Sequence, residues 1–415
     1  MNLWNPAVDH QPAEVMRCVT ADDVRAGLAR AADSGLGVSV LSGGHDWLGR
    51  SVRPGGLVLD LSAMRTVSVI GDVVIAGGGA RSLDVMTAAE ESGSSVVAGT
   101  VGSVGITGFT LGGGYGPLNG LVGTGADNLL AAEVVLADGR LAHASERSDP
   151  DLLWALRGGG GNFGVVTALH LRAFPIASVL AGIVTFGWDE AARVLQSYGD
   201  ICAEAPDELT VRAGVTTLPN GRAVAFVAPA WVGEPAAGRQ WMKRITGLGR
   251  PLTVDIRSKS FNDVLREGDA MFAGAGLHHD MAMRNVAALT TDVVATVIEA
   301  AEARSSPFSA IEIFPFHGAA TRLPVESTAF AQRDGHFLIE LIGSWNPDER
   351  SDQHWARDTS RKLAPYALPG GYPNLLGPHD DEQVAHAYGP NTERLLALKR
   401  RFDPGSVFSA TPLPH

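Results

Sequence analysis

Three clusters of glycine lie in the first 165 residues and strongly limit what this chain can fold into. They occupy positions 43–44, 99–116 and 158–164, and 50 of the 415 residues are glycine, well above the usual frequency of about 7%. Glycine lets the backbone approach a ligand closely, and successive N–H groups in such turns bind anions. Close packing of helices and strands would explain one cluster easily and three poorly. We therefore expect several loops to converge on one long cofactor that carries a diphosphate.

Two common nucleotide motifs do not fit these glycines. Residues Gly159, Gly161 and Gly164 match G-x-G-x-x-G by letters, but a helical pattern precedes them and an extended run follows. A dinucleotide fingerprint needs the opposite order, strand then loop then helix. The run 73–82 has the right preceding strand, but Ser82 replaces the last glycine. The chain has no G-x-x-x-x-G-K-[ST] sequence, so neither a nicotinamide site nor a P-loop is predicted.

Charge and cysteine content exclude other classes. The 33 basic and 45 acidic residues give a net charge of −12, which argues against nucleic-acid binding. The only cysteines, Cys18 and Cys202, cannot form a disulfide framework. His278 and His279 are adjacent, so their side chains point apart in an extended chain, and no metal is expected. No apolar run of membrane-spanning length and no signal peptide are seen, so a cytoplasmic protein away from membranes is expected.

The order of elements predicts an α+β fold. Helices and strands alternate to about residue 175, and a second unit with longer elements follows. Its predicted strands are 179–187, 209–217, 222–231, 252–260, 308–316 and 336–345, and its predicted helices are 189–204, 235–247, 290–304 and 351–364. This pattern indicates one antiparallel sheet covered by helices. The chain then becomes rich in glycine and proline and ends with a helix at 391–401.

Four sequence blocks lie in order along the whole chain: Ser42–His45, Val104–Gly116, Asp151–Gly164 and Tyr372–Phe408. They read S-G-G-H, V-G-I-T-G-F-T-L-G-G-G-Y-G, D-L-L-W-A-L-R-G-G-G-G-N-F-G, and Y-P-N followed by Y-G-P-N-x-x-R-L and K-x-x-F-D-P-x-x-V-F. Together they resemble the berberine-bridge-enzyme-like oxidases, which have the vanillyl-alcohol-oxidase type of FAD-binding fold. The resemblance implies a FAD-binding domain at 1–175, an inserted substrate domain at 176–369 and a return to the FAD-binding domain at 370–415.

The resemblance also implies how FAD is held. The cofactor would be attached covalently through His45 only, because Val101 stands where many relatives carry a second, cysteine tether. Val104 stands at the position that controls oxygen access in relatives, although it could equally be an ordinary packed valine. The residues that the resemblance assigns to FAD are Ser42, Gly43, Gly44, His45, Val101, Val104, Gly105, Gly108, Gly112, Gly113, Gly114, Gly161, Gly164, Val165, Val166, Tyr372 and Asn374.

Glu340 is the first candidate for the catalytic base. Some relatives use a tyrosine directly after Y-x-N, but this chain has Leu375 there. Glu340 is the one acid inside the apolar run 336–343, and it shares a strand face with Leu338 and Ile342. A carboxylate in such a run is costly unless it is paired or functional. A structural glutamate in a salt bridge remains the alternative.

Other candidates lie nearby in the sequence. Glu312, Phe314 and Phe316 share a face of the strand before, and His317 follows where many relatives have glycine. We expect Glu312 to be catalytic, and Phe314, Phe316 and His317 to bind substrate. Tyr115, in the G-G-G-Y-G turn, is a further catalytic candidate, or an aromatic residue that packs on the flavin.

The function expected is that of an FAD-dependent oxidase. A small alcohol, amine or natural-product intermediate would give hydride to FAD, and O2 would be reduced to H2O2. Two phenylalanines with two carboxylates fit an apolar or cationic molecule better than a large sugar. A flavin-dependent cyclase or isomerase, or a flavin-binding protein without turnover, remains the alternative. The sequence predicts neither the substrate's identity nor the oligomeric state.

Overall fold

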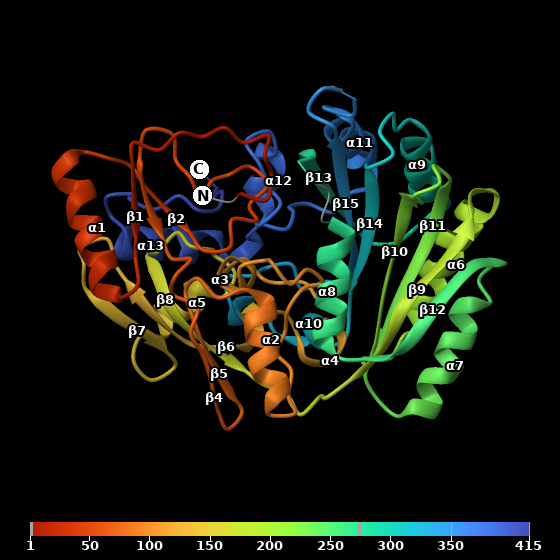
Figure 1. Ribbon diagram of the computed structural model, residues 1–415, viewed down its shortest axis with the longest axis horizontal. Coiled ribbons are helices and arrows are strands. Elements are labelled where there is room, and N and C mark those ends of the chain that lie inside the picture. The colour runs from red at the N-terminus through yellow and green to blue at the C-terminus, as the bar shows by residue number, and fades with distance from the viewer. Residues whose placement is uncertain (1–2, 273–275, 350, 415) are drawn as a thin grey trace.

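The chain folds into three β-sheets surrounded by helices (Figure 1), in a computed structural model that describes residues 3–272, 276–349 and 351–414. The first sheet is parallel, in the order β1 (Glu14–Arg17), β3 (Leu57–Asp60), β2 (Val38–Leu41). The second is antiparallel, in the order β4 (Val67–Ile70), β5 (Val73–Gly77), β8 (Val165–Arg172), β6 (Leu129–Val135), β7 (Leu141–Ser145).

The third sheet has seven strands, and every neighbouring pair is antiparallel. Its order is β12 (Pro251–Lys259), β9 (Val179–Gly187), β11 (Ala223–Trp231), β10 (Leu209–Thr217), β14 (Ala310–Phe316), β15 (His336–Trp345), β13 (His278–Val286). Six of these strands agree with the sequence prediction to within two residues. The predicted α+β fold class is therefore confirmed.

Helices surround these sheets on both sides of the molecule. Those before β8 are α1 (Ala21–Ser34), α2 (Ser82–Glu91), α3 (Ile106–Leu111), α4 (Asn119–Val122) and α5 (Pro150–Leu156). Those after β9 are α6 (Ala191–Glu204), α7 (Pro235–Thr246), α8 (Phe261–Phe272), α9 (Thr291–Glu302), α10 (Ala319–Arg322), α11 (Trp355–Leu363), α12 (Asp381–His386) and α13 (Thr392–Phe402). Within the described ranges, no helix is long and apolar enough to cross a bilayer.

The seven-stranded sheet has two different faces. Helices α6, α9 and α11 cover one face and bury a core of aliphatic side chains against it. The other face looks toward the first two sheets, and α8 stands between the two parts of the molecule (Figure 1). Because these helices bury one face, the side chains of the second face can contact a ligand.

The sequence did not predict β13 or α8. Strand β13 carries Asp280 and Arg284, and these charges hide its apolar pattern. Both are satisfied within the fold: Arg357 donates to the Asp280 carboxylate at 2.6 Å, and Arg284 donates to the Ser360 hydroxyl at 3.1 Å. Pairing of this kind is what allows charged groups to be buried.

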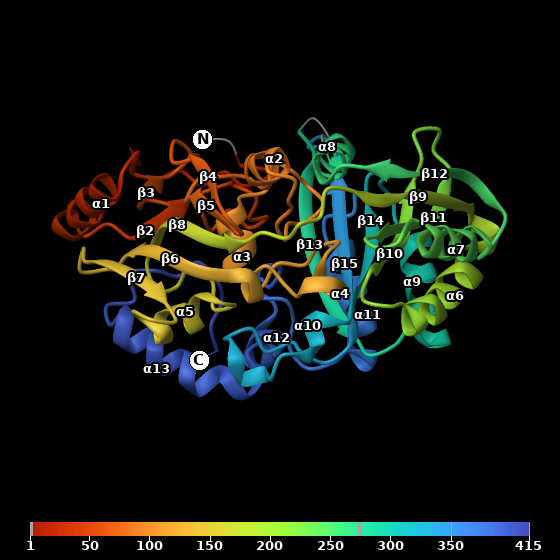
Figure 2. The same ribbon diagram turned by 90° about the horizontal axis from the view of Figure 1, so that it is seen from below.

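The end of the chain returns to the first part of the molecule. Figure 2 shows α13 running beneath the region of α5 and β7. Arg394 and Arg401 of α13 both donate to Asp151 of α5, at 3.0 and 2.8 Å. This return brings residues after 369 to the same cavity as the glycine loops.

Candidate functional site

A cavity of about 410 Å³ lies between the glycine loops and the free face of the seven-stranded sheet. We call its two sides the loop wall and the sheet wall. The loop wall consists of lining residues from 42–47, 99–111 and 160–166, and the sheet wall consists of Met281, Glu312, Phe314, Leu338, Glu340 and Ile342. Segments 372–375 and 408–411 add further lining, as do Tyr115 and residues near the two arginines Arg50 and Arg53. All three predicted glycine clusters therefore reach one cavity.

Glycines of the loop wall serve two different purposes. Gly43 and Gly105 touch each other, because a Cβ on Gly43 would lie 2.2 Å from the Gly105 nitrogen. Gly108 lies inside α3, and no atom of the described residues outside the helix backbone comes within 4 Å of the place its Cβ would take. Glycine in a helix costs about 1 kcal/mol relative to alanine, and no protein contact requires it here. The space beside Gly108 thus fits a ligand lying along the loop wall.

Several residues predicted to contact ligand do not line the cavity: Gly112, Gly113, Gly114, Val165, Phe316 and His317. A Cβ on Gly112 would lie 2.0 Å from Asn374 Oδ1, and Gly113 and Gly114 have φ of 126° and 86°. Such φ values favour glycine, so these three shape a turn behind the lining. Val165 is buried in a separate core, and His317 lies against Gly120.

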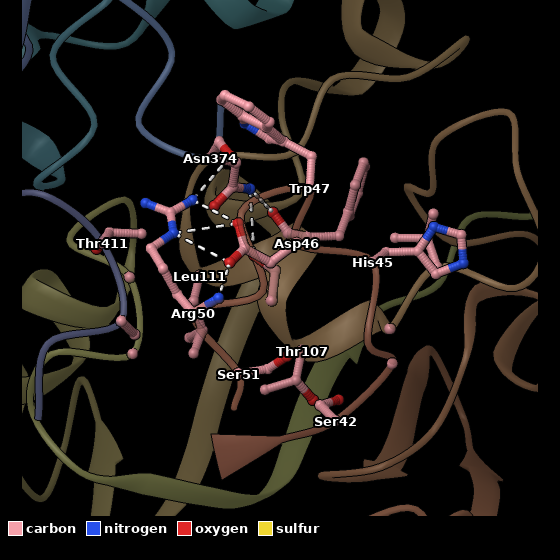
Figure 3. A pocket seen from close by; sticks show the side chains of 18 of the residues that line it. Ser42, His45, Asp46, Trp47, Arg50, Ser51, Thr107, Leu111, Asn374 and Thr411 are labelled. Atoms are coloured by element: carbon pink, nitrogen blue, oxygen red, sulfur yellow. Dashed lines mark hydrogen bonds and ion pairs between the residues drawn. The ribbon is translucent and has the colours of Figure 1, made fainter. Parts of the chain in front are cut away.

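A polar group that the sequence analysis missed lies at the other end of the cavity. Arg50 pairs with Asp46 at 2.7 Å and also donates to the carbonyls of Leu376 and Asn374. Figure 3 shows this cluster, with His45 well apart from it. Arg53 lines the same region and donates to the Ser409 hydroxyl. The arginines follow the histidine loop without a recognisable motif, so only their positive charge near a predicted diphosphate could have indicated them.

His45 lines the cavity and is partly buried. Burial lowers the pKa of its imidazole to about 4, opposed by Asp269 and assisted by Arg81. A histidine with this pKa is neutral at neutral pH, which is the form that has a free lone pair on one ring nitrogen. The ring can therefore act as a nucleophile.

Glu312 and Glu340 are directly opposite each other on β14 and β15. Arg212 donates to the Glu312 carboxylate at 2.6 Å, and its guanidinium lies over the rings of Phe226 and Phe314. Among the described residues, no cation forms an ion pair with Glu340. Burial and the Glu312 charge raise the pKa of Glu340 to about 8, against a smaller effect of Arg212. Two facing carboxylates thus divide into an ion-paired one and one that holds a proton near neutral pH.

Tyr115 lines the cavity, but its hydroxyl is committed elsewhere. Its Oη lies 3.0 Å from His336 Nε2, and His336 Nδ1 lies 2.7 Å from the carbonyl of Asp334. A carbonyl only accepts, so Nδ1 donates and Nε2 accepts the Tyr115 proton. Burial raises the pKa of Tyr115 well above its usual value and lowers that of His336 to about 4. Tyr115 is therefore a poor base, and His336 is a partner that the sequence analysis missed.

Tyr372 presents a free donor to the cavity. Its hydroxyl oxygen accepts hydrogen bonds from the Gly114 N–H at 3.1 Å and from Asn374 Nδ2 at 2.9 Å. Burial raises the pKa of Tyr372 to about 12, so the hydroxyl keeps its proton. With both lone pairs used, the O–H of Tyr372 is available to a bound ligand.

A second cavity of about 120 Å³ adjoins the first. The two share Thr100, Tyr115 and Phe314 as lining, and the smaller one continues over β9, β10 and β11 past Arg212. A group of histidine, cysteine or acidic side chains able to hold a metal is not found in the described part of the chain.

Comparisons with known proteins identify relatives that are FAD-linked oxidases. A model of the FAD binding domain family matches residues 12–145, and a model described as berberine and berberine like matches residues 372–412. (R)-6-hydroxynicotine oxidase of Paenarthrobacter nicotinovorans is 30% identical, over 98% of this chain and 92% of that protein. VAO-type flavoprotein oxidase VAO615 of Thermothelomyces thermophilus is 29% identical, over 96% of this chain and 75% of that protein.

Solved structures show the same fold. The crystal structure of 6-hydroxy-D-nicotine oxidase from Arthrobacter nicotinovorans matches with a TM-score of 0.88 and 28% identity, over 100% of this chain and 94% of that one. Glucooligosaccharide oxidase from Acremonium strictum matches with a TM-score of 0.85 and 24% identity, over 100% and 94%.

The fold, the cavity and these matches define an FAD-dependent oxidoreductase. The chain belongs to the berberine-bridge-enzyme-like family of FAD-linked oxidases, which has the vanillyl-alcohol-oxidase type of fold.

Proposed function

We propose that this protein is an oxidase of small, largely apolar amines, with Glu340 as the group that accepts the substrate proton. The observation that carries the proposal is the facing pair Glu312 and Glu340, of which only Glu312 is paired with an arginine in the part of the chain that the structure describes. In this proposal residues 1–175 and 370–415 bind FAD, and residues 176–369 form the substrate domain.

The loop wall would hold FAD. Its backbone at 43–44, 105–108 and 160–161 can approach a cofactor closely, and Arg50 and Arg53 supply positive charge at the far end. FAD, when bound, supplies the acceptor for a hydride from the substrate. Tyr372 and Asn374 close the lining between the two walls.

His45 would carry FAD covalently. A ring nitrogen of His45 would form the bond to the 8α carbon of the flavin. One C–H bond of that carbon and the imidazole N–H bond would break, two protons would leave, and the two electrons would pass on to O2. Glucooligosaccharide oxidase is described with a 6-S-cysteinyl, 8α-N1-histidyl FAD. Val101 lines the cavity of this chain, so we propose the histidyl link alone.

Glu340 is suited to an amine substrate. A carboxyl whose pKa lies near 8 can exchange a proton with an amine close to neutral pH. Phe314, Met281 and Ile342 line the same wall and offer apolar contact. One relative is named as a hydroxynicotine oxidase, and hydroxynicotine is a small amine of the proposed class. The electrons would finally reduce O2 to H2O2, with Val104 at the cavity leaving room for oxygen.

A substrate panel tests the proposal. We expect the purified flavoprotein to release peroxide with one or more secondary or tertiary amines of small size. Oligosaccharides should give much less. Peroxide from sugars but not from amines would overturn the substrate class. Flavin reduction under anaerobic conditions, without peroxide in air, would overturn the use of O2.

The tether is tested separately on the same preparation. Acid-precipitated protein should remain yellow, and His45→Ala should release its flavin on denaturation. Peptide mapping should find flavin on one peptide. Flavin retained by the denatured His45→Ala variant would overturn the assignment.

A further inference from the structure

Residues Leu3–Ala7 connect the two walls of the cavity, and we call them the strap. The backbone N–H of Trp4 donates to the carbonyl of Gly44 at 2.8 Å. Asn5 is 2% exposed, and its amide nitrogen donates to the carbonyl of Trp47 at 2.7 Å. These two hydrogen bonds fix the strap to the loop wall at Gly44 and at Trp47, which lie on either side of His45 in the sequence.

The same strap is fixed to the outermost strand of the seven-stranded sheet. Asn5 Nδ2 also donates to the carbonyl of His279 at 2.9 Å, and Asn5 Oδ1 accepts from the His279 N–H at 3.1 Å. Because β13 is an edge strand, these two backbone groups would otherwise lack a partner in the sheet. One buried asparagine therefore ties the histidine loop to the sheet.

Trp4 contacts two imidazoles. Its indole lies parallel to the ring of His279, with centroids 4.2 Å apart and planes at 13°. It also lies against His45, with centroids 5.9 Å apart and planes at 22°. Trp4 itself lines the cavity. The ring that would bond to FAD is thus oriented by a neighbouring aromatic ring whose own position the sheet fixes.

We propose that Trp4 and Asn5 are positioning residues for the covalent attachment of FAD at His45. They hold the imidazole in one orientation and keep water from it, so that its neutral nitrogen meets the flavin. This inference rests on the histidyl tether of the proposed function. A displacement of about 1 Å between reacting groups can slow a reaction about 10²-fold, which is the kind of effect that loss of the strap should produce.

The test measures attachment without measuring activity. Full-length Trp4→Leu and Trp4→Phe would be purified, and total FAD would be compared with the FAD that survives acid precipitation. Leucine keeps apolar bulk without an aromatic face, whereas phenylalanine keeps the face. Trp241→Leu serves as the control, because Trp241 lies on α7, outside the cavity lining, under the guanidinium of Arg244.

We expect Trp4→Leu to bind FAD but to attach it about tenfold more slowly or worse. Trp4→Phe should attach most of its FAD, and Trp241→Leu all of it. Asn5→Ala should also attach FAD more slowly than the parent chain. Thermal melting of each variant establishes that it is folded, and Trp4→Phe keeps the test decisive if the leucine variant is unstable.

The outcomes separate the two proposals. If the parent chain loses its FAD on denaturation, the tether itself is wrong, and the role given to the strap fails with it. If the parent is tethered and Trp4→Leu attaches FAD at the parent rate, only the inference about the strap is overturned. Equal loss in Trp4→Phe and Trp4→Leu would also overturn it, because stacking would then not matter.

Discussion

The two walls of the cavity are built on different principles. The loop wall is rich in glycine, and some of its residues are constrained by close approach, as between Gly43 and Gly105. The sheet wall is made of side chains on regular strands, which any residue could occupy without altering the backbone. In the proposed function, the first wall therefore accommodates the large cofactor, and the second selects the substrate.

The largest effect should come from the sheet wall. Glu340→Gln keeps the shape of the side chain but removes the base, so flavin reduction by substrate should fall by about 10²–10⁴-fold, with FAD still bound. Stopped-flow absorbance measures this rate. Glu299→Gln, an exposed change on α9, is the control. A parent-like rate in Glu340→Gln would assign the role to another group.

Two glycine substitutions should separate packing from ligand space in the loop wall. Gly43→Ala places a Cβ 2.2 Å from the Gly105 nitrogen, so we expect lower stability with or without FAD. Gly108→Ala meets no protein atom, so the unloaded protein should gain up to about 1 kcal/mol while FAD binds more weakly. Urea unfolding and flavin titration measure both quantities. Unchanged FAD affinity in Gly108→Ala would place the cofactor elsewhere.

Val104 should give a smaller effect. It lines the cavity on the loop wall, and an added methylene there would narrow the approach of O2. We expect Val104→Ile to slow reoxidation of the reduced enzyme several-fold, with little change in the reduction step. Mixing reduced enzyme with oxygenated buffer measures the rate, and equal rates would remove Val104 from this role.

The last effect concerns stability and depends on pH. The folded-state pKa of Glu340 is about 8, above that of an unfolded glutamate at about 4.3. The folded chain therefore holds a proton that the unfolded chain loses, and stability falls as pH rises through this window. Glu340→Gln lacks the effect, so its melting-temperature advantage should grow from about pH 4.5 to pH 8 and then level off. A constant difference would contradict the raised pKa.

The sequence predicted the loop wall better than the sheet wall. Glycine clusters and the His45 loop are local patterns, and their convergence on a cofactor could be inferred before the fold was known. The pairing of Arg212 with Glu312 could not, because these residues are 100 positions apart and meet only through strand register. His336 with Tyr115 and Asn5 with His279 are also far apart in the sequence, and these pairs meet only in the folded chain.

Not every glycine that was predicted to contact the cofactor lines the cavity. Gly112, Gly113 and Gly114 lie outside its lining, in a turn packed against Asn374, Phe330 and Phe109. A sequence shows that a position needs glycine; it does not show whether a ligand or the protein itself fills the nearby space. The two cases are distinguished by the atoms that a Cβ at each glycine would meet.

The central claim is that Glu340 accepts the substrate proton beside the Glu312–Arg212 pair, and the pH dependence of flavin reduction tests it most directly. At saturating substrate the rate should rise with pH as Glu340 loses its proton, with a midpoint near its pKa of about 8. Glu312→Gln removes a facing negative charge and frees Arg212, so the midpoint should move to lower pH. Glu340→Gln should lose this transition. A transition that stays at the same pH in both variants would contradict the account.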